Sequence, residues 1–448
     1  MCLCESQVFG FNAIFWVLTF IKFITVWKGG ETMHQKQKFV YVGVDTHKLT
    51  HTAVIINCWG DKLGEITIDN KPSAFNSLLV EVKKHAKRKK AVYGLEDCGG
   101  VGRALAVFLL GEKKIVKEVD SSLANVERQA LPTYHKDDSF DALCVARVLL
   151  SRLDELRNAN PQDLYWTVNQ LVQRREALVK SSSALKSQLH VQLAYNYPSY
   201  NKFFSEIDGK TALAFWEKYP SASKLKDATL EELSQLLIKN SHNYYTVKKA
   251  EQIISIVDND GVIEVPEYQY IRDFLVESMV KEIKFKEEEI SRVEAQVKAI
   301  VDKMGYKLHT MNGIDIVTAA KLIGEIGDIE RFPTPAKLAK YAGVAPITYS
   351  SGQKDKQLKS QQGNRNLYGI FHLLAVHQIL QDRNTKNPRN PVFREYYEKK
   401  MSEGKTSGQA IVCISRRLVN IIWGMMKNKS EYKLPENISK NLSNKKDE

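Results

Sequence analysis

Three segments of strand length follow one another early in the chain, the first of them strongly apolar, and they constrain the fold more than any other feature. The segments cover residues 39–45, 51–57 and 64–69, with a turn at 59–62 before the third. Short runs bounded by turn residues are typical of buried strands. We therefore expect three consecutive strands that belong to one sheet.

Helices and strands alternate after these three strands. The pattern predicts helices at residues 73–87, 99–110 and 137–150, and strands at 91–96 and 114–119. Three strands followed by such alternation indicate a mixed sheet covered by helices on both faces. This order matches the ribonuclease-H-like fold, so we predict an α/β domain of that class over residues 38–155.

The rest of the chain is predicted to be mostly helical. Residues 160–195 and 275–304 are long charged stretches with apolar residues every three or four positions, which is typical of coiled-coil arms. Between them lies a helical insert, residues 196–274, in which we find no chemical motif. The predicted parts are then a coiled-coil segment with its insert at 156–308, a mostly helical C-terminal domain at 309–430 and a polar tail at 431–448.

The C-terminal domain opens with a glycine-rich segment that resembles a helix-hairpin-helix. Gly313 precedes an apolar helix predicted at 317–323, and Gly324 and Gly327 follow it. Such a hairpin can offer backbone N–H groups to a phosphate. A plain helical turn explains the pattern equally well. The last helix is predicted at 411–426, before a tail that we expect to be disordered.

An apolar stretch from Val8 to Trp27 is long enough to span a bilayer. It could be a membrane anchor or an uncleaved signal, but a positive n-region and a cleavage site are missing and Lys22 lies inside the stretch. We favour Met33 as the natural start, with residues 1–32 as translated upstream sequence outside the fold. No membrane partner is therefore expected.

The composition favours an anionic partner. The chain of 448 residues has a formal net charge of +13 and a pI near 9.2, and its basic residues are spread along its length. Nucleic acid is a better candidate than a membrane surface, although a basic protein without such a partner remains an alternative. The six cysteines have neither zinc-site spacing nor the density of a disulfide framework, which fits a cytoplasmic protein.

Four acidic residues stand where a metal site would recruit them. Asp45 ends the first apolar run, Glu96 ends the run at 91–96, and Asp138 and Asp141 lie one turn apart at the head of a helix. Hard divalent cations prefer oxygen ligands, and two-metal phosphoryl chemistry needs several converging carboxylates. The four acids together predict a Mg²⁺ or Mn²⁺ site.

Each acid alone also has a structural explanation. Asp138 could be the N-cap of its helix, Asp141 a solvated first-turn charge, and Glu96 a surface strand end. The neighbouring acids Asp97 and Asp137 could in turn compete as metal ligands. It is the conjunction of the four acids in one predicted domain that favours the metal site.

The segments that carry these acids resemble the DEDD transposases of bacterial insertion sequences. The matching segments are Gly-Val-Asp-Thr-His-Lys at 43–48, Gly-Leu-Glu at 94–96 and Lys-Asp-Asp-Ser-Phe-Asp-Ala at 136–142. The resemblance implies a RuvC-like version of the ribonuclease H fold. It also implies that Asp45, Glu96, Asp138 and Asp141 bind the catalytic metal, and that a bridge RNA guides recombination.

The resemblance continues in the C-terminal domain. It covers Arg-Phe at 331–332, the segment at 338–346, and Tyr-Ser-Ser-Gly at 349–352. In the family the serine directly before that glycine is the nucleophile, which implies this role for Ser351. From the residues alone Ser-Ser-Gly is a common turn composition, and Ser350 cannot be ranked below Ser351. The resemblance further implies that the two domains of one site come from different subunits of a dimer or tetramer.

The chain departs from the family pattern at several positions. Asp137 replaces a usual threonine, Asp97 and Cys98 replace a small residue and a hydroxyl, and Gln361 and Tyr368 replace basic residues. These changes put individual nucleic-acid contacts in doubt and leave the five proposed catalytic positions intact. The basic residues that we expect to contact nucleic acid are Lys354, Lys356, Lys359, Arg365, Lys405, Arg416 and Arg417.

The hypothesis is therefore a transposase in which a metal held by four acids aids Ser351 in attacking a DNA phosphodiester. Two alternatives stay open. A metal-dependent nuclease of the Holliday-junction type would hydrolyse DNA with water and would not need Ser351. A non-catalytic nucleic-acid-binding protein on a decayed nuclease fold would need neither the serine nor the acids.

Overall fold

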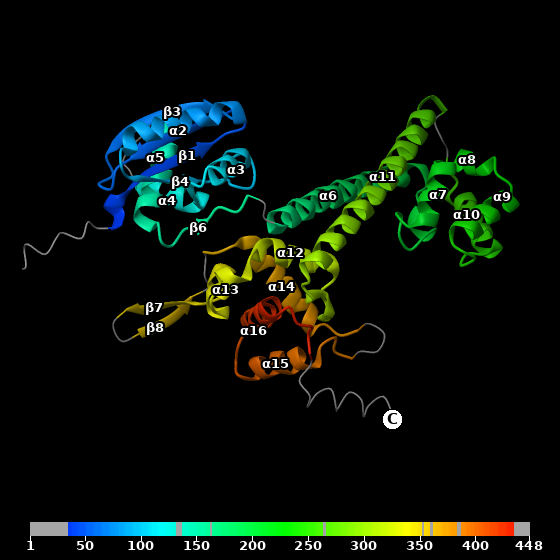
Figure 1. Ribbon diagram of the computed structural model, residues 1–448. Helices are drawn as coiled ribbons and strands as arrows, with labels where there is room; N and C mark the ends of the chain where they lie inside the picture. The colour runs from blue at the N-terminus through cyan, green and yellow to red at the C-terminus, as the bar shows by residue number, and fades with distance from the viewer. Residues whose placement is uncertain are drawn as a thin grey trace, which may run out of the picture. The chain divides into compact units, whose positions relative to one another are not determined.

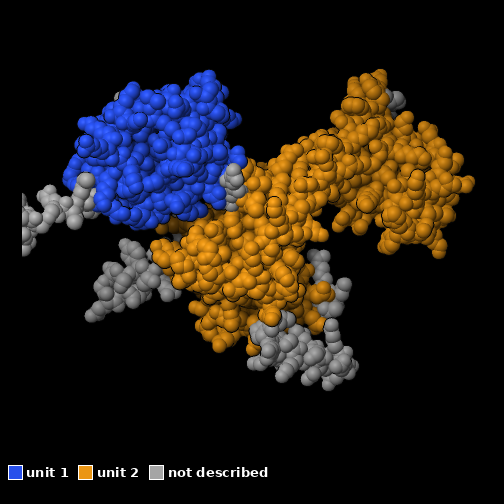
Figure 2. All heavy atoms as spheres, in the orientation of Figure 1, with its two compact units in different colours: residues 1–163 blue, residues 164–448 orange. Residues whose placement is uncertain are grey.

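The computed structural model describes residues 35–130, 137–161, 164–262, 266–351, 354–358, 362–382 and 387–433. The chain forms two compact units, residues 1–163 and 164–448 (Figure 2). The predicted upstream extension with its apolar stretch lies outside the described residues, as does the tail from residue 434 onward. Within the described ranges, no helix has the length and apolar character needed to cross a bilayer.

Unit 1 is built on a six-stranded mixed sheet (Figure 1). Its strands are β1 (Phe39–Thr46), β2 (Thr50–Ile56), β3 (Lys62–Asp69), β4 (Lys90–Leu95), β5 (Ile115–Glu118) and β6 (Arg157–Asn158). They lie in the order β3-β2-β1-β4-β5-β6; β1, β4 and β5 run parallel, and the other neighbours pair antiparallel. The predicted mixed α/β domain is confirmed, and the sheet is consistent with a ribonuclease-H-like fold.

Helices cover both faces of this sheet. They are η1 (Gln35–Lys38), α2 (Pro72–Ala86), α3 (Arg103–Gly111), α4 (Ser121–Ala130) and α5 (Asp138–Arg152). Alternate residues of β1 enter different cores, since Val42 packs with α2 and α3 whereas Tyr41 packs with α4 and α5. Successive residues of β1 point to opposite faces of the sheet, and both faces are covered. The strand therefore reads as a continuous apolar run in the sequence.

Two details of unit 1 differ from the prediction. The helix predicted at 99–110 begins only at Arg103, because the Asp97 carboxylate accepts hydrogen bonds from Gly100 N (2.6 Å) and Val101 N (2.9 Å) and holds a turn there. Helix α4 and the short strand β6 were not predicted. Helix α4 is only ten residues long and buries a single residue, Ala124, so few apolar positions mark it in the sequence.

Two long helices organise unit 2. They are α6 (Leu164–Asn196) and α11 (Pro266–Met304), and they pack side by side in opposite directions (Figure 1). The antiparallel register shows in a series of contacts along their length, which are Tyr165 Oη with Tyr306 Oη at 2.6 Å, Arg175 Nε with Glu294 Oε1 at 2.7 Å, Lys186 Nζ with Glu287 Oε1 at 3.2 Å and Gln269 Nε2 with Asn196 Oδ1 at 3.3 Å. The two long helical stretches expected from the sequence are present.

The helical insert forms a core at one end of this helix pair. Its elements are η2 (Tyr200–Lys202), α7 (Lys210–Lys218), α8 (Ala222–Lys226), α9 (Leu230–Asn240) and α10 (Val247–Asp260). Phe203, Phe215 and Trp216 are fully buried there and pack ring against ring. The core also includes Leu189 of α6 and Val280 of α11, so the insert is anchored on both long helices.

The other end of the pair contributes to a larger, mostly helical core. Its elements are η3 (Leu308–Thr310), α12 (Ile316–Ile326), η4 (Ile329–Arg331), α13 (Pro335–Tyr341), α14 (Arg365–Ile379), α15 (Pro391–Ser402) and α16 (Ser407–Asn428). The strands β7 (Ile347–Ser351) and β8 (Lys354–Leu358) form a hairpin between α13 and α14 in the chain. The helices predicted at 317–323 and 411–426 are confirmed as α12 and α16. The latter begins earlier because Thr406 and Gln409 form a capping box.

Candidate functional site

Two of the predicted site acids lie at the same edge of the sheet. Strands β1 and β4 are parallel neighbours, with Val44 paired to Leu95. Asp45 follows Val44 near the end of β1, and Glu96 follows Leu95 directly after β4. The two acids therefore lie side by side at the carboxyl ends of these strands. Neighbouring parallel strands bring distant sequence positions together in this way, and ligands of open α/β sheets commonly bind at such an edge.

A close helix contact places the other two acids beside them. Helix α5 packs against β1 at Gly43, where a Cβ atom would lie 2.2 Å from both Ala142 O and Ala146 N. Asp45 is two residues after Gly43 on the same face of the strand. Asp138 is four residues before Ala142 on the same face of the helix. The glycine therefore lets the first turn of α5 approach Asp45.

The start of α5 assigns separate roles to its three acids. Asp137 is the N-cap, and its side chain accepts a hydrogen bond from Phe140 N at 2.7 Å. The alternative in which Asp138 is the N-cap is therefore wrong. Asp138 is exposed in the first turn, whereas Asp141 is buried to 9% exposure. Asp137 is thus engaged in capping and Asp97 in its turn, so both have a structural role apart from metal binding.

Two residues with no predicted role also reach the acids. His47 Nε2 lies 3.0 Å from Asp45 Oδ2 and 3.4 Å from Asp138 Oδ1. Arg128 of α4 forms an ion pair with Asp141, with Nε and Oδ1 2.6 Å apart. The Asp-x-His spacing at a strand end was the available signal for His47. Arg128 had none, because its helix was not predicted.

The electrostatics show that the acids interact with one another. Burial raises the pKa of Asp45, His47 lowers it, and the charges of Asp141 and Asp138 raise it further. Burial likewise raises the pKa of Glu96, and the nearby charge of Asp45 adds to that effect. His47 lowers the pKa of Asp45, and Arg128 and a hydrogen bond from Ser121 lower that of Glu96, yet both pKa values remain raised, so the positive charge at the site only partly compensates the acids. The Arg128 guanidinium supplies part of that charge through its partner Asp141.

The donor set fits a divalent cation. Ligand atoms of Asp45, His47 and Asp138 all lie within 4.8 Å of one another. Glu96 Oε1 is buried and accepts no hydrogen bond from the described residues, which is unusual for a buried carboxylate. Carboxylate oxygens suit Mg²⁺ and Mn²⁺, and an added imidazole is compatible with Mn²⁺. This cluster can hold a cation without rearranging the sheet.

The predicted serine lies in unit 2, at the end of a two-stranded hairpin. The backbone of Ser351 pairs with Lys354, and that of Ser350 pairs with Asp355. Lys356 also lies on β8, whereas Lys359 falls outside the described residues. The serine and two of the predicted basic residues thus share one hairpin, a proximity that the sequence spacing already suggested.

The other predicted basic residues differ in how far they are engaged. Arg365 is exposed at the first position of α14, and Lys405 is half-buried just before α16. Arg416 donates a hydrogen bond from Nη1 to Pro335 O at 3.2 Å, and the Arg417 guanidinium lies 4.6 Å from the ring centroid of Tyr396. Arg365 and Lys405 are therefore better placed to receive a phosphate than Arg416.

A mixed sheet with interacting acids at its carboxyl edge is an arrangement that metal-dependent enzymes acting on phosphodiesters use. Comparison with known proteins identifies the family. A family model of DEDD transposases of the IS110 type matches residues 42–198, and one described as the transposase IS116/IS110/IS902 family matches residues 305–398. The chain belongs to this family of DEDD transposases, enzymes that cleave and recombine DNA.

Individual relatives agree with the family models. The chain is 23% identical over 401 residues to a 44.8 kDa protein of insertion element IS116 from Streptomyces clavuligerus, covering 89% of this chain and 97% of the relative. It is 26% identical over 306 residues to a 43.6 kDa protein of IS110 from Streptomyces coelicolor, covering 67% and 73%. A pilin gene-inverting protein of Moraxella bovis is 30% identical over 122 residues, covering 27% and 36%.

Proposed function

We propose that this transposase cuts DNA through attack by Ser351, aided by a divalent cation at Asp45, Glu96, Asp138 and Asp141. The observation that carries the proposal is the cluster of Asp45, His47 and Asp138, whose ligand atoms lie within 4.8 Å of one another. Glu96 and Asp141 interact electrostatically with Asp45 and are proposed to complete the site. Their mutual effects on pKa support a shared site. Mg²⁺ is the expected ion, with Mn²⁺ as a substitute.

The proposed step forms a bond between Ser351 Oγ and the phosphorus atom and breaks the bond from phosphorus to a deoxyribose oxygen. The serine proton is transferred away and the departing oxygen ends as a hydroxyl, so the DNA strand is held as a phosphoserine ester. A bound cation would offset the charge of the phosphate during this exchange. Reversal by another DNA hydroxyl rejoins a strand without an external energy source.

His47 is suited to a supporting role in this step. Its imidazole is half-exposed and lies within 3.4 Å of two of the proposed ligands. An imidazole at that place can either ligate the cation or accept a proton from the attacking hydroxyl. Both roles predict that a His47→Gln variant retains the fold and loses activity.

The proposal includes a guide RNA and a homo-oligomer. The net charge of +13 supports a polyanionic partner in addition to the DNA that transposases act on. The acids and the serine lie in different compact units. The mechanism therefore requires a serine hairpin, from the same chain or from another subunit of a dimer or tetramer, to reach an acidic site.

Hydrolysis by water is the second candidate, because the acidic site is assembled within unit 1 alone. The two mechanisms are separated by incubating the full-length protein with the DNA ends of its element, RNA transcribed from the element's flanks, and Mg²⁺. A covalent adduct is detected as labelled DNA that migrates with protein on a denaturing gel. Ser351→Ala and Asp138→Ala should each remove the adduct.

Matched neighbours provide the controls. Ser350→Ala changes the adjacent hydroxyl, and Asp137→Asn changes the capping acid beside Asp138 while an amide oxygen can still cap the helix. Both variants should retain the adduct. An undiminished adduct in Ser351→Ala would sink the serine assignment, and cleavage without any adduct would favour the hydrolytic alternative.

A further inference from the structure

A hollow of about 950 Å³ lies beside the serine hairpin in unit 2. It is formed by η4, α13, the segment that enters β7 and the segment before α14. The residues that line it are Arg331, Phe332, Pro333, Ala336, Lys337, Lys340, Tyr341, Ala345, Pro346, Gln362 and Gly363. Its volume lies at the upper end of the range for small-molecule pockets, so it can admit a group as large as a nucleotide.

Planar groups form one wall of this hollow. The Arg331 guanidinium lies 4.6 Å from the ring centroid of Phe332 and 4.5 Å from that of Tyr341. The two rings are 5.2 Å apart and tilted by 46°. Trp423 Nε1 donates to Phe332 O at 2.8 Å, which fixes the backbone behind the wall. Aromatic rings and arginine planes are the groups on which unpaired bases stack.

The backbone next to this wall is held by two glycines in left-handed conformations. Gly343 has φ +67 and Gly363 has φ +105. A Cβ on Gly343 would lie 2.8 Å from Gln362 O, and one on Gly363 would lie 2.7 Å from Tyr341 O. Asn364 N also donates to Tyr341 O at 2.7 Å. The two segments are thus pressed together, and the hollow exists before any ligand binds.

The charge of the hollow is positive. Lys337 and Lys340 are exposed on α13, and no acidic residue is among the described residues that line the hollow. No described residue forms an ion pair with either lysine. The lysines are therefore available to a phosphate, while the planar wall is available to a base.

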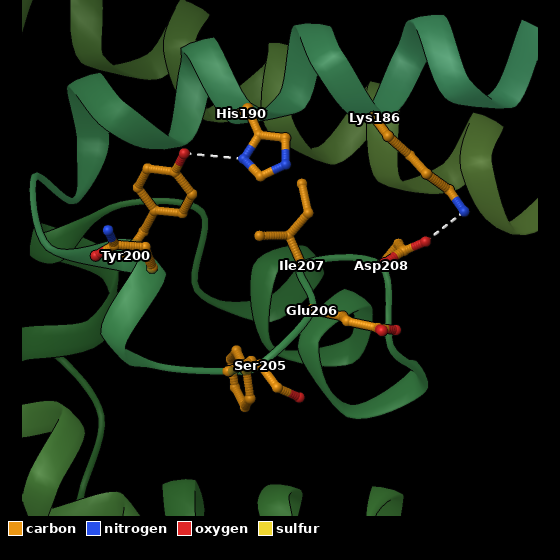
Figure 3. Close-up of a pocket in the computed structure, with 9 residues that line it drawn as sticks. Lys186, His190, Tyr200, Ser205, Glu206, Ile207 and Asp208 are labelled. Carbon is orange, nitrogen blue, oxygen red and sulfur yellow. Dashed lines mark hydrogen bonds and ion pairs between the residues drawn. The ribbon is translucent and has the colours of Figure 1, made fainter. Parts of the chain in front are cut away.

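A second hollow of about 270 Å³, next to α6, shows the contrast (Figure 3). There the polar side chains face one another, with Lys186 bound to Asp208 and His190 Nδ1 2.8 Å from Tyr200 Oη. Glu206 adds a further negative charge to the same lining. In that hollow Lys186 and His190 have partners in the lining. In the larger hollow neither Lys337 nor Lys340 forms an ion pair with a described residue.

We propose that the larger hollow binds one unstacked nucleotide of single-stranded DNA, adjacent to the phosphate that the serine hairpin presents for cutting. Tyr341, with the Arg331 guanidinium against its ring, stacks on the base, and Lys337 and Lys340 hold its phosphate. The position favours DNA over the guide RNA, because Ala345 and Pro346 of the lining lead directly into β7, and β7 ends at Ser351, the proposed nucleophile for DNA. The choice of DNA rests on the proposed function; the base-binding character of the hollow does not.

The test measures binding of the full-length protein to a fluorescent eight-nucleotide oligothymidine and to the same oligomer with two central abasic sites. Loss of one stacked base should weaken wild-type binding about tenfold. Tyr341→Leu should bind both oligomers equally, whereas Tyr341→Phe, which keeps the ring, should restore the preference. Lys340→Ala should weaken both and reduce the salt slope by about one unit.

Lys226→Ala serves as the matched control, because Lys226 is an exposed lysine at the end of α8 in the helical insert. It should bind like wild type, and circular dichroism should show all variants folded. Equal wild-type affinity for the intact and abasic oligomers would overturn the base pocket. Tighter binding of oligouridine than of oligothymidine would overturn the choice of DNA. The adduct assay reports on the proposed function separately, since it can succeed or fail regardless of the abasic comparison.

Discussion

The acidic site and the serine hairpin differ in how firmly the fold holds them. The acids stand on two central strands and on a helix packed against them, and each of these elements belongs to a buried core. The hairpin is a separate sheet of two strands, β7 and β8, that pair only with each other. A lone hairpin draws little stability from its own pairing. Under the proposed mechanism, the metal-binding acids would stand on the rigid element, and the serine that attacks DNA would stand on the smaller hairpin.

The largest expected effect comes from replacing one acid and comparing its loss of adduct formation and of metal stabilisation with the effect of replacing Ser351. Asp141→Asn should lower the rate of adduct formation by about 10³-fold, because it removes a ligand and leaves Arg128 without its ionised partner. It should also abolish the rise in melting temperature caused by Mn²⁺. Ser351→Ala should lose the adduct equally and keep the Mn²⁺ effect. If both variants lose the Mn²⁺-induced rise in melting temperature, or both keep it, metal binding is not confined to the acidic site.

The helix contact at Gly43 provides the next test. Gly43→Ala should destabilise unit 1 by about 3 kcal/mol, because the new methyl group meets backbone atoms of α5 at 2.2 Å and the helix must move. Chemical denaturation measures this loss, and metal binding should fall with it. Gly111→Ala is the control, since a Cβ there meets nothing within 4 Å. Equal stability of the two variants would mean that α5 is not seated on β1.

These elements also show which features the sequence could predict. Strands β1, β2 and β4 were recognisable because most of their residues are buried on both faces, and Asp45 and Glu96 because they stand at the ends of β1 and β4. Arg128 was missed because its helix α4, which is short and buries a single residue, was not predicted. The pairing of Asp141 with Arg128 depends on side chains that meet across two helices. Ser351 was carried by family resemblance alone, since a short serine-containing turn has no distinguishing periodicity.

The pH dependence offers a smaller effect with a definite sign. Burial raises the pKa of Asp45 and of Glu96, so the folded protein binds these protons more tightly than the unfolded chain does. Their contribution to stability is present below the unfolded pKa near 4 and is lost as the pH rises through the folded values. A cation replaces the missing positive charge. Mg²⁺ should therefore raise the melting temperature more at pH 7.5 than at pH 5.

Asp45→Asn tests this expectation further, because the variant should be more stable than wild type without metal and less stable than wild type with Mg²⁺. Without metal at pH 7.5, the variant should melt about 2 to 4 °C above wild type, since it no longer buries a charge. With Mg²⁺ it should melt below wild type. Asp69→Asn, at an exposed strand end with a partner in Lys71, should change neither result. A variant that responds to Mg²⁺ like wild type would exclude Asp45 as a ligand.

The smallest effects belong to basic residues of unit 2, where a single contact is expected to change binding without affecting the acids of unit 1. Lys405→Ala should reduce the slope of log affinity for duplex DNA against log salt by about 0.9, the value for one phosphate contact. Arg416→Ala should instead lower thermal stability with little change in slope, because its guanidinium donates to Pro335 O and burial lowers its pKa. Binding titrations between 50 and about 200 mM salt measure the slope. If Arg416→Ala changes the slope as much as Lys405→Ala does, the half-buried arginine also reaches DNA and the basic surface extends toward α13.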